Sequence, residues 1–481
     1  MLCGSIACHP APPAHPAPPA SLLRDIDAIL SRPELERGYW GALVKSLRTG
    51  ETLYALNARK LMMPASNMKI VTLAAAIDRL GLDYTYTTRF LAAGPIEAGV
   101  LQGDVLVVGS GDPSFSSADG SADAALDACA ERLNRLGVRT IGGRILGDDH
   151  AFDGDALGFG WSWDDLPDDY AAGVGALQFN ENSARLTVTP GLAVGDVAAI
   201  SVEPPGTGLT VDNRLRTVDQ ESTVTIQARR LPGSSRLELR GSIPLRSAPV
   251  VRTLSVDNPT QFLVNTIRRG LIARGIDVRG AAVDIDDIAD RLPGDRAIEL
   301  ITHRSPPLSA LAVRLMKASQ NLYAETLLKT IGSAAGAPTA LGGRMVAEAA
   351  LQRWGVASDG LILRDGSGLS RYDYVTPETL VAILSHVDGD AQLRGPFEAS
   401  LPVAGRDGTL ANQFKGTPAE GRVLAKTGSM ANVRALSGYA TTVAGEPLVF
   451  SIIANNFSAA PAVVVAAIDA IVVRIVAENV R

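Results

Sequence analysis

The feature that most limits the fold of this chain is a long central segment that differs in composition from both flanks. Residues from about 89 to 300 contain no lysine, are rich in glycine and aspartate, and carry short runs of β-branched residues. Between about 184 and 250 these runs alternate with turn residues and show no helical period, which indicates a small all-β module. Because 481 residues exceed one compact core, we expect a multi-domain chain with a large central insertion.

The flanks predict a mixed α/β (α+β) domain. Alternating apolar residues at 40–44 and 52–56 predict a strand pair with a turn at 48–50, and helical spacing follows over 70–80, ending at Gly81. After the insertion, helical periodicity returns over 308–331. The last part of the chain predicts antiparallel strands at 422–425, 435–442 and 448–454, followed by a closing helix.

The closing helix is apolar enough to suggest a membrane span. Asp469 and Arg474 interrupt its apolar run, which is also shorter than the roughly 20 residues that a span requires. We therefore predict a helix packed on a sheet, with Ser458 as its N-terminal cap.

Charge and cysteine content exclude several classes of protein. The net charge of -6 and the pI near 5.5 argue against general nucleic-acid binding, which requires a basic surface. Three cysteines give no disulfide framework, and we expect Cys129 to be buried and inert. Five histidines and three cysteines at no ligand spacing argue against a zinc site, so we expect no metal.

Residues 1–20 form a Pro-rich tail that shows no complete signal peptide. Two interpretations stay open. Ser5-Ile6-Ala7-Cys8 resembles an imperfect lipoprotein cleavage box, which would give the protein a lipid anchor at the membrane. Alternatively the segment is a disordered tail, because Pro-rich sequence buries no core.

A first chemical motif lies at the start of the predicted helix, where Ser66 precedes Lys69 by three residues. This spacing places both side chains on one helix face, so the lysine can reach the hydroxyl group. A serine nucleophile requires a base, and lysine can serve when desolvation lowers its pKa. Ser66 also suits a helix cap, which is the structural alternative.

Two further motifs follow in the second flank. Ser319 and Asn321 lie between two helical stretches, where a hydroxyl can relay a proton and an amide can orient the lysine. Lys426, Thr427 and Gly428 follow an apolar strand, where a cation and a hydroxyl suit a substrate carboxylate and glycine allows close backbone approach. The patterns Ser-x-x-Lys, Ser-x-Asn and Lys-Thr-Gly each occur once, in this order. Together they match the set of motifs found in penicillin-recognising enzymes.

With these motifs, the sequence resembles the class C low-molecular-mass penicillin-binding proteins, the D-alanyl-D-alanine carboxypeptidases and endopeptidases of the S13 serine peptidase family. The resemblance begins near residue 22 and covers most of the chain. Its characteristic segments are 64–66, 103–106, 111–113, 365–371, 401–405, 407–410 and 425–429.

The resemblance implies a β-lactamase-like transpeptidase domain, with an antiparallel sheet flanked by helices, over 21–88 and 301–481. Two inserted domains would split it: domain II over 89–183 and 251–300, and a nested β domain III over 184–250. It also implies an extracytoplasmic or periplasmic enzyme that acts on peptidoglycan stem peptides. β-Lactams would then be covalent inhibitors, and no metal or organic cofactor would be required.

The resemblance assigns the chemistry residue by residue. Ser66 attacks the penultimate D-Ala carbonyl, Lys69 takes its proton, and the Ser66 and Ser429 N–H groups stabilise the oxyanion. Ser319 protonates the leaving D-Ala and Asn321 orients the groups. Lys426 and Thr427 bind the terminal carboxylate.

The resemblance further implies a pocket for the zwitterionic end of a diaminopimelate side chain. Asp165 would bind the ammonium and Arg371 the carboxylate. The adjacent Asp164 is the alternative to Asp165, and Ala431 replaces a hydroxyl residue found in some relatives. Gln320 stands where Asp is common, and we expect little effect because this side chain points away from the substrate.

Three rival functions remain from other classes. A β-lactamase uses the same motifs, but the chain length and the insertion speak against it. A non-catalytic peptidoglycan-binding protein would be expected to lack Ser66 or Lys69, and both are present. A Ser-His-Asp hydrolase is disfavoured because none of the five histidines lies in a recognisable nucleophile-elbow motif. Carboxypeptidase and endopeptidase activity, the third-residue preference and the oligomeric state stay open.

Overall fold

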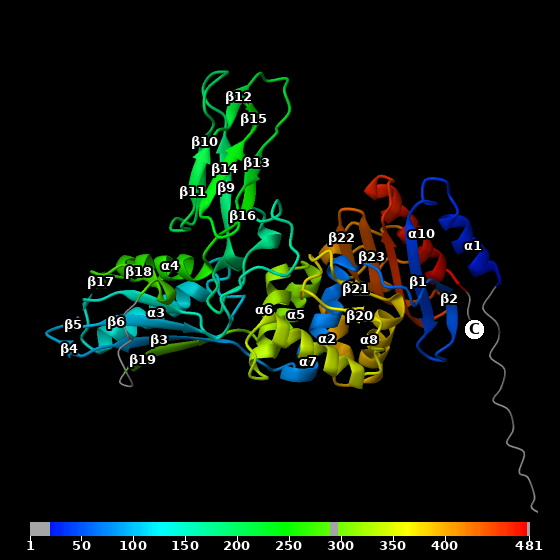
Figure 1. Ribbon diagram of the computed structural model, residues 1–481, viewed down its shortest axis with the longest axis horizontal. Coiled ribbons are helices and arrows are strands. Elements are labelled where there is room, and N and C mark those ends of the chain that lie inside the picture. The colour runs from blue at the N-terminus through cyan, green and yellow to red at the C-terminus, as the bar shows by residue number, and fades with distance from the viewer. Residues whose placement is uncertain (1–19, 289–296, 479–481) are drawn as a thin grey trace, which may run out of the picture.

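The computed structural model describes residues 20–288 and 297–478. Figure 1 shows three bodies: a sheet covered by helices and built from both flanks, a second mixed body, and a β module that rises from the second. The predicted Pro-rich tail, apart from Ala20, lies outside the described residues. The structure therefore does not test either interpretation of the tail, the lipid anchor at Cys8 or the disordered segment.

The two flanks meet in one antiparallel sheet of order β2-β1-β24-β23-β22. β1 pairs with β24 along its whole length, so the first and last strands of the chain lie side by side in the sheet. β22 forms one edge. The strands are β1 (Tyr39–Ser46), β2 (Thr52–Leu56), β22 (Val423–Met430), β23 (Val433–Thr441) and β24 (Pro447–Asn455).

Helices cover both faces because successive strand residues point to opposite sides. Along β24, Phe450 and Ile452 pack into one core, while Val449 and Ile453 pack into the other. The first core is closed by α1 (Ala20–Leu30) and α10 (Pro461–Val476). The second contains α2 (Met68–Leu80), α5 (Leu308–Lys317), α6 (Asn321–Ser333), α7 (Ala340–Arg353), α8 (Pro377–Gly389) and α9 (Arg394–Ser400).

The insertion departs and returns through two paired strands, β3 (Thr87–Ala93) and β19 (Ile298–Arg304), in which Thr87 lies opposite Arg304. We therefore infer a boundary slightly outside the expected residues 89 and 300. Two sheets, β18-β8-β6-β3-β19 and β17-β7-β5-β4, pack with α3 (Ser121–Arg135) and α4 (Pro259–Ala273). The other strands are β4 (Ile96–Glu97), β5 (Val100–Leu101), β6 (Asp104–Gly109), β7 (Thr140–Ile141), β8 (Ile145–Asp148), β17 (Asp277–Val278) and β18 (Ala282–Asp284).

The module nested in the insertion is built from strands, as its alternating pattern predicted. At its base β9 (Ser183–Thr189) pairs with β16 (Val250–Ser255), and Leu186 and Leu254 join its aliphatic core. The sheets have the orders β10-β9-β16, β11-β14-β13 and β12-β15. The remaining strands are β10 (Ala199–Glu203), β11 (Thr210–Asn213), β12 (Arg216–Val218), β13 (Gln227–Arg229), β14 (Arg236–Arg240) and β15 (Ser242–Pro244).

Most elements predicted from periodicity are confirmed, but the cap of the last helix is wrong. α10 begins at Pro461, with Ala460 at the cap position and no side-chain cap, because proline itself starts a helix well. Within the described residues no helix combines the length and the apolar character needed to cross a bilayer. Cys129 is fully buried in α3, and burial raises the pKa of its thiol to about 12.

Candidate active site

Ser66 and Lys69 meet where a short 3-10 turn, Ala65–Asn67, continues into α2. Lys69 Nζ donates a hydrogen bond to Ser66 Oγ at 2.8 Å, as the spacing of the motif predicted. The alternative role for Ser66 was a helix cap. Neither the turn nor α2 has a hydrogen bond from a capping side chain, so the Ser66 hydroxyl does not cap the helix.

Lys69 is fully buried and held by three acceptors. Besides Ser66, its Nζ donates to Asn321 Oδ1 at 2.6 Å and to the Ser367 carbonyl at 3.0 Å. Burial lowers the pKa of Lys69 to about 7, and the negative charges of Asp365 and Glu325 oppose this shift. A lysine with this pKa is substantially neutral near pH 7 and can accept the proton of a serine.

Ser319 and Lys426 form a second serine–lysine pair in the same site. Ser319 lies in the turn between α5 and α6 at φ +59°, a conformation that costs energy for a residue other than glycine. Its Oγ accepts a hydrogen bond from Lys426 Nζ at 2.9 Å. Lys426 is fully buried, and its burial and the charge of Lys69 together lower its pKa well below the usual range.

The edge strand β22 offers backbone groups beside these side chains. Thr441 N–H donates to the Arg422 carbonyl, so the alternation of the antiparallel ladder turns the N–H groups of Thr427 and Ser429 toward the open edge. Thr427 Oγ1 donates to Thr409 Oγ1 at 2.7 Å, and Ser429 is exposed. An extended peptide can therefore bind along this edge.

Gly428 allows a close packing contact within the protein. The sequence predicted a glycine that allows close backbone approach, and the approach of a substrate stays a prediction. A Cβ atom at Gly428 would lie 2.5 Å from the Pro64 carbonyl oxygen. The glycine therefore lets β22 pack directly against the turn that carries Ser66.

A loop beneath Lys69 contributes groups that sequence reasoning missed. Glu325 accepts hydrogen bonds from the Gly366 and Ser367 N–H groups at 3.0 and 2.7 Å, which orients the Ser367 carbonyl toward Lys69. Asp365 accepts from the Gly368 and Ser370 N–H groups, both at 2.6 Å. A signal existed, since Glu325 follows Asn321 by four residues on one helix face.

Asp165 and Arg371 lie on neighbouring loops but do not touch. Asp165 Oδ1 accepts a hydrogen bond from the Tyr170 hydroxyl at 2.8 Å, and Arg371 is exposed beside the turn that joins β22 and β23. Among the described residues, the recorded partner of Asp165 is Tyr170 and that of Arg371 is the Ala431 carbonyl, so the two charged groups are not paired with each other. Their loops are nevertheless in contact, because the rings of Phe159 and Tyr372 lie 5.7 Å apart.

Asp164, the alternative to Asp165, has other neighbours. It lines a cavity of about 410 Å³ together with Arg229 and Arg252. Gln320 has a structural role: its Oε1 accepts from Leu322 N–H at 3.2 Å and caps α6, while its Nε2 donates to Glu181 in the insertion at 2.7 Å.

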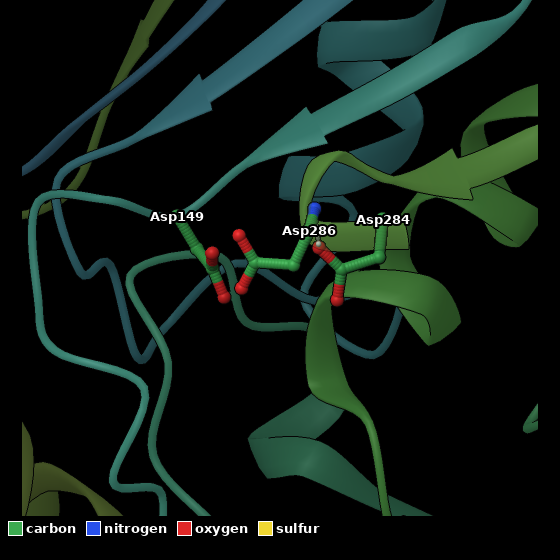
Figure 2. Close-up of side chains that lie close together, drawn as sticks. All are labelled: Asp149, Asp284 and Asp286. Carbon is green, nitrogen blue, oxygen red and sulfur yellow. Dashed lines mark hydrogen bonds between the residues drawn. The ribbon is translucent and has the colours of Figure 1, made fainter. Parts of the chain in front are cut away.

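One group of acidic side chains in the insertion has the size of a cation site. Asp149, Asp284 and Asp286 bring one carboxylate oxygen each within 4.8 Å of one another (Figure 2). Thr260 Oγ1 donates to Asp149 at 2.6 Å and Asn258 Nδ2 to Asp284 at 2.8 Å, while Asp286 pairs with a histidine. These contacts account for the cluster, and we assign no cation to it.

Known proteins match this arrangement over nearly the whole chain. Residues 22–477 match the model of the D-Ala-D-Ala carboxypeptidase 3 (S13) family. The chain belongs to this family. It is 39% identical over 469 residues to a D-alanyl-D-alanine carboxypeptidase of Actinomadura sp. (strain R39), covering 94% of this chain and 84% of that protein.

Two further comparisons concern Haemophilus influenzae. D-Alanyl-D-alanine carboxypeptidase DacB from this organism is 26% identical over 423 residues, which cover 87% of this chain and 85% of that protein. The crystal structure of its penicillin binding protein 4 (dacB) superimposes with a TM-score of 0.80 at 25% identity, covering 90% of this chain and 94% of that one. The S13 family and the mixed α+β fold of a penicillin-binding protein, both expected from the resemblance, are thus confirmed.

Proposed function

We propose that this protein is a serine-type D-Ala-D-Ala carboxypeptidase that removes the terminal D-Ala from peptidoglycan stem peptides through an acyl-enzyme. The observation that carries the proposal is the contact of a buried lysine, Lys69, with Ser66 Oγ at 2.8 Å. The 39% identity to a D-alanyl-D-alanine carboxypeptidase along 94% of the chain supports the substrate class.

In the first half-reaction, Ser66 Oγ attacks the carbonyl carbon of the penultimate D-Ala while its proton passes to Lys69 Nζ. Asn321 Oδ1, 2.6 Å from this nitrogen, accepts a hydrogen bond and holds the resulting ammonium in place. The N–H groups of Ser66 and Ser429 stabilise the oxyanion. The lowered pKa of Lys69, about 7, makes this proton transfer feasible near neutral pH.

The tetrahedral adduct then collapses, and its C–N bond breaks as the leaving D-Ala nitrogen takes the proton of Ser319 Oγ. Lys426 Nζ, 2.9 Å from that oxygen, replaces the proton and with Thr427 binds the terminal carboxylate. The substrate carboxylate favours the charged form of Lys426 and so leaves Lys69 as the neutral lysine of the pair. The proton on Lys69 then passes to the neutral Lys426, which leaves Lys69 neutral again. Water attacks the ester carbonyl as Lys69 takes its proton, and Lys69 delivers that proton to the departing Ser66 Oγ, so both lysines and the serine return to their starting states.

At the other end of the substrate, Asp165 and Arg371 bind the ammonium and carboxylate of a diaminopimelate side chain. Their position on two contacting loops supports this assignment, whereas Asp164 lines a cavity with Arg229 and Arg252. β-Lactams, whose ring amide resembles D-Ala-D-Ala, acylate Ser66. A crystal structure of the Haemophilus influenzae penicillin binding protein 4 was determined in complex with a β-lactam. The substrate is cell-wall polymer, so the enzyme acts outside the cytoplasm.

The experiment that tests this function follows two products over time. Incubation with a diaminopimelate-containing pentapeptide should release D-Ala, while labelled penicillin should form an adduct that persists. Rapid turnover of penicillin without D-Ala release would indicate a β-lactamase, and neither reaction would indicate a binding protein. Purified cross-linked peptidoglycan as substrate separates carboxypeptidase from endopeptidase activity by the fragments released.

A further inference from the structure

One loop of the insertion, residues 160–171, contacts Asn321 and the acid Asp365 near Lys69. The Tyr170 carbonyl accepts a hydrogen bond from Asn321 Nδ2 at 2.7 Å, on the amide whose other end meets Lys69. Trp161 Nε1 donates to Asp365 Oδ2 at 2.8 Å. The amide and the acid both belong to the transpeptidase domain, so the loop bridges the two bodies at the site itself.

Asp365 is suited to pass this contact on to Lys69. It is 1% exposed, and its two oxygens accept the N–H groups of Gly368 and Ser370 in the loop that carries the Ser367 carbonyl. That carbonyl accepts a hydrogen bond from Lys69 Nζ at 3.0 Å. The indole N–H is a side-chain donor to this buried carboxylate, and charge-assisted bonds of this kind are the strong ones.

We propose, building on the function proposed above, that Trp161 and Tyr170 are positioning residues for catalysis. The Trp161 indole fixes Asp365 and through it the Ser367 carbonyl that holds Lys69, while the Tyr170 carbonyl fixes the orientation of the Asn321 amide. The insertion thus completes the active site without supplying a group that reacts.

The charges around Lys69 make the proposal measurable. Asp365 on the loop favours its ammonium form, and Glu325 on α6 does so when it is ionised, since burial raises the pKa of Glu325 to about 8. Lys426 on β22 also faces Lys69, and the charge of Lys69 adds to burial in lowering the pKa of Lys426. Asp373 lies next to Asp365, and burial together with the charge of Asp365 raises the pKa of Asp373. If the indole N–H is lost, Asp365 keeps its two backbone donors but loses the side-chain donor that fixes the orientation of its carboxylate. The carboxylate then stabilises the ammonium form of Lys69 less well, so the lysine becomes neutral at lower pH.

The test compares Trp161→Phe, which removes the donor and keeps an aromatic ring, with Trp163→Phe, at an exposed tryptophan two residues away. The rate constant for acylation by labelled penicillin is measured on the full chain from pH 5 to 9. Trp161→Phe should lower the plateau rate about tenfold or more and shift the midpoint of the acid limb to lower pH, while Trp163→Phe should change neither.

Equal behaviour of the two variants would overturn the proposal. The proposal would also be overturned if the acylation rate of Trp161→Phe fell only in proportion to the loss of folded protein, with the midpoint of the acid limb unchanged. That result would indicate a purely structural effect. NMR of the ¹⁵N-labelled wild type provides a second measurement, because the indole N–H signals can be followed without relying on a variant that folds. The Trp161 signal should titrate with the midpoint of the acid limb and shift on acylation, and a signal constant from pH 5 to 9 would contradict the proposal.

Failure of the proposed function would look different. A wild-type protein that neither takes up penicillin nor releases D-Ala would contradict the carboxypeptidase assignment. The pH dependence of the Trp161 indole N–H signal would still show whether this indole responds to the charge of Lys69, and so whether the insertion loop positions that lysine.

Discussion

Two fully buried lysines, each bonded to a serine hydroxyl, dominate the active site at the scale of single residues. Lys69 Nζ lies 2.8 Å from Ser66 Oγ and Lys426 Nζ 2.9 Å from Ser319 Oγ. Burial lowers the pKa of both lysines, and the charge of Lys69 lowers that of Lys426 further. In the proposed mechanism two residues of the same type thus have different roles, Lys69 as the base and Lys426 as the cation that binds the substrate carboxylate.

The pKa of Lys69 predicts the pH dependence of acylation. Only neutral Lys69 accepts the serine proton, so the acylation rate should rise with pH through about 7, the pKa to which burial lowers this lysine. Lys69→Arg should lose nearly all activity across this range, because guanidinium stays protonated. Stopped-flow acylation from pH 5 to 9 checks both statements, and a rate independent of pH would remove Lys69 from the role of base.

Gly428 gives a prediction about packing next to the nucleophile. Gly428→Ala places a methyl group 2.5 Å from the Pro64 carbonyl and forces β22 away from the turn that carries Ser66. We expect acylation to slow by about tenfold or more and the melting temperature to fall. Gly395→Ala in α9, where a Cβ meets no atom within 4 Å, is the matched control and should change neither.

At the scale of elements, the loop 160–171 and the segment 365–371 lie in contact and carry the proposed side-chain pocket. Trp161 joins them through its bond to Asp365, and the rings of Phe159 and Tyr372 lie in contact. Asp165 is held by the Tyr170 hydroxyl, while Arg371 remains exposed. Each loop thus carries one charge of the proposed side-chain pocket.

The specificity of this pocket can be measured as a ratio between two substrates. Asp165→Ala and Arg371→Ala should each lower kcat/KM for a diaminopimelate peptide by about ten- to a hundredfold. A peptide whose third residue lacks the free ammonium and carboxylate should be cleaved slowly and almost equally by all variants. Asp164→Ala is the control, and an unchanged substrate ratio in the first two variants would place the pocket elsewhere.

The sequence predicted the elements better than the contacts between them. Periodicity located the strand pair near the start of the chain, the helix that carries Lys69 and the last three strands, because these are local patterns. It did not reveal the hydrogen bond between Trp161 and Asp365, which are separated by 204 residues. Nor did it predict that Gly428 packs against Pro64, since such approaches depend on the tertiary fold.

At the scale of the whole molecule, the nested β module stands apart from the chemistry but not from the loop (Figure 1). Arg230, 5% exposed, donates to the Leu166 carbonyl at 2.7 Å and to Asp257 at 2.7 Å. The module therefore supplies one anchor to the loop 160–171. Its strands rise away from the helices and the sheet that carry the three motifs (Figure 1), so the motifs should work without them.

Excision of the module tests this division. Val188 lies opposite Val250, so residues 189–249 can be replaced by an Asn-Gly turn that closes β9 and β16 into a hairpin. The product should still be acylated by a small β-lactam, at a rate within about tenfold of that of Arg230→Met in the full chain, since both lose the same anchor. A well-folded deletion protein that takes no β-lactam would show that the module does more than hold the loop.

The most direct test of the whole account is the site of the covalent bond. Labelled penicillin is added to the wild type, and the adduct is located by peptide mapping with mass spectrometry. We predict one penicilloyl group per chain, attached to Ser66 and absent from a folded Ser66→Ala variant. An adduct on Ser319 or any other residue, or an adduct that persists in Ser66→Ala, would contradict the assignment of the nucleophile and the mechanism built on it.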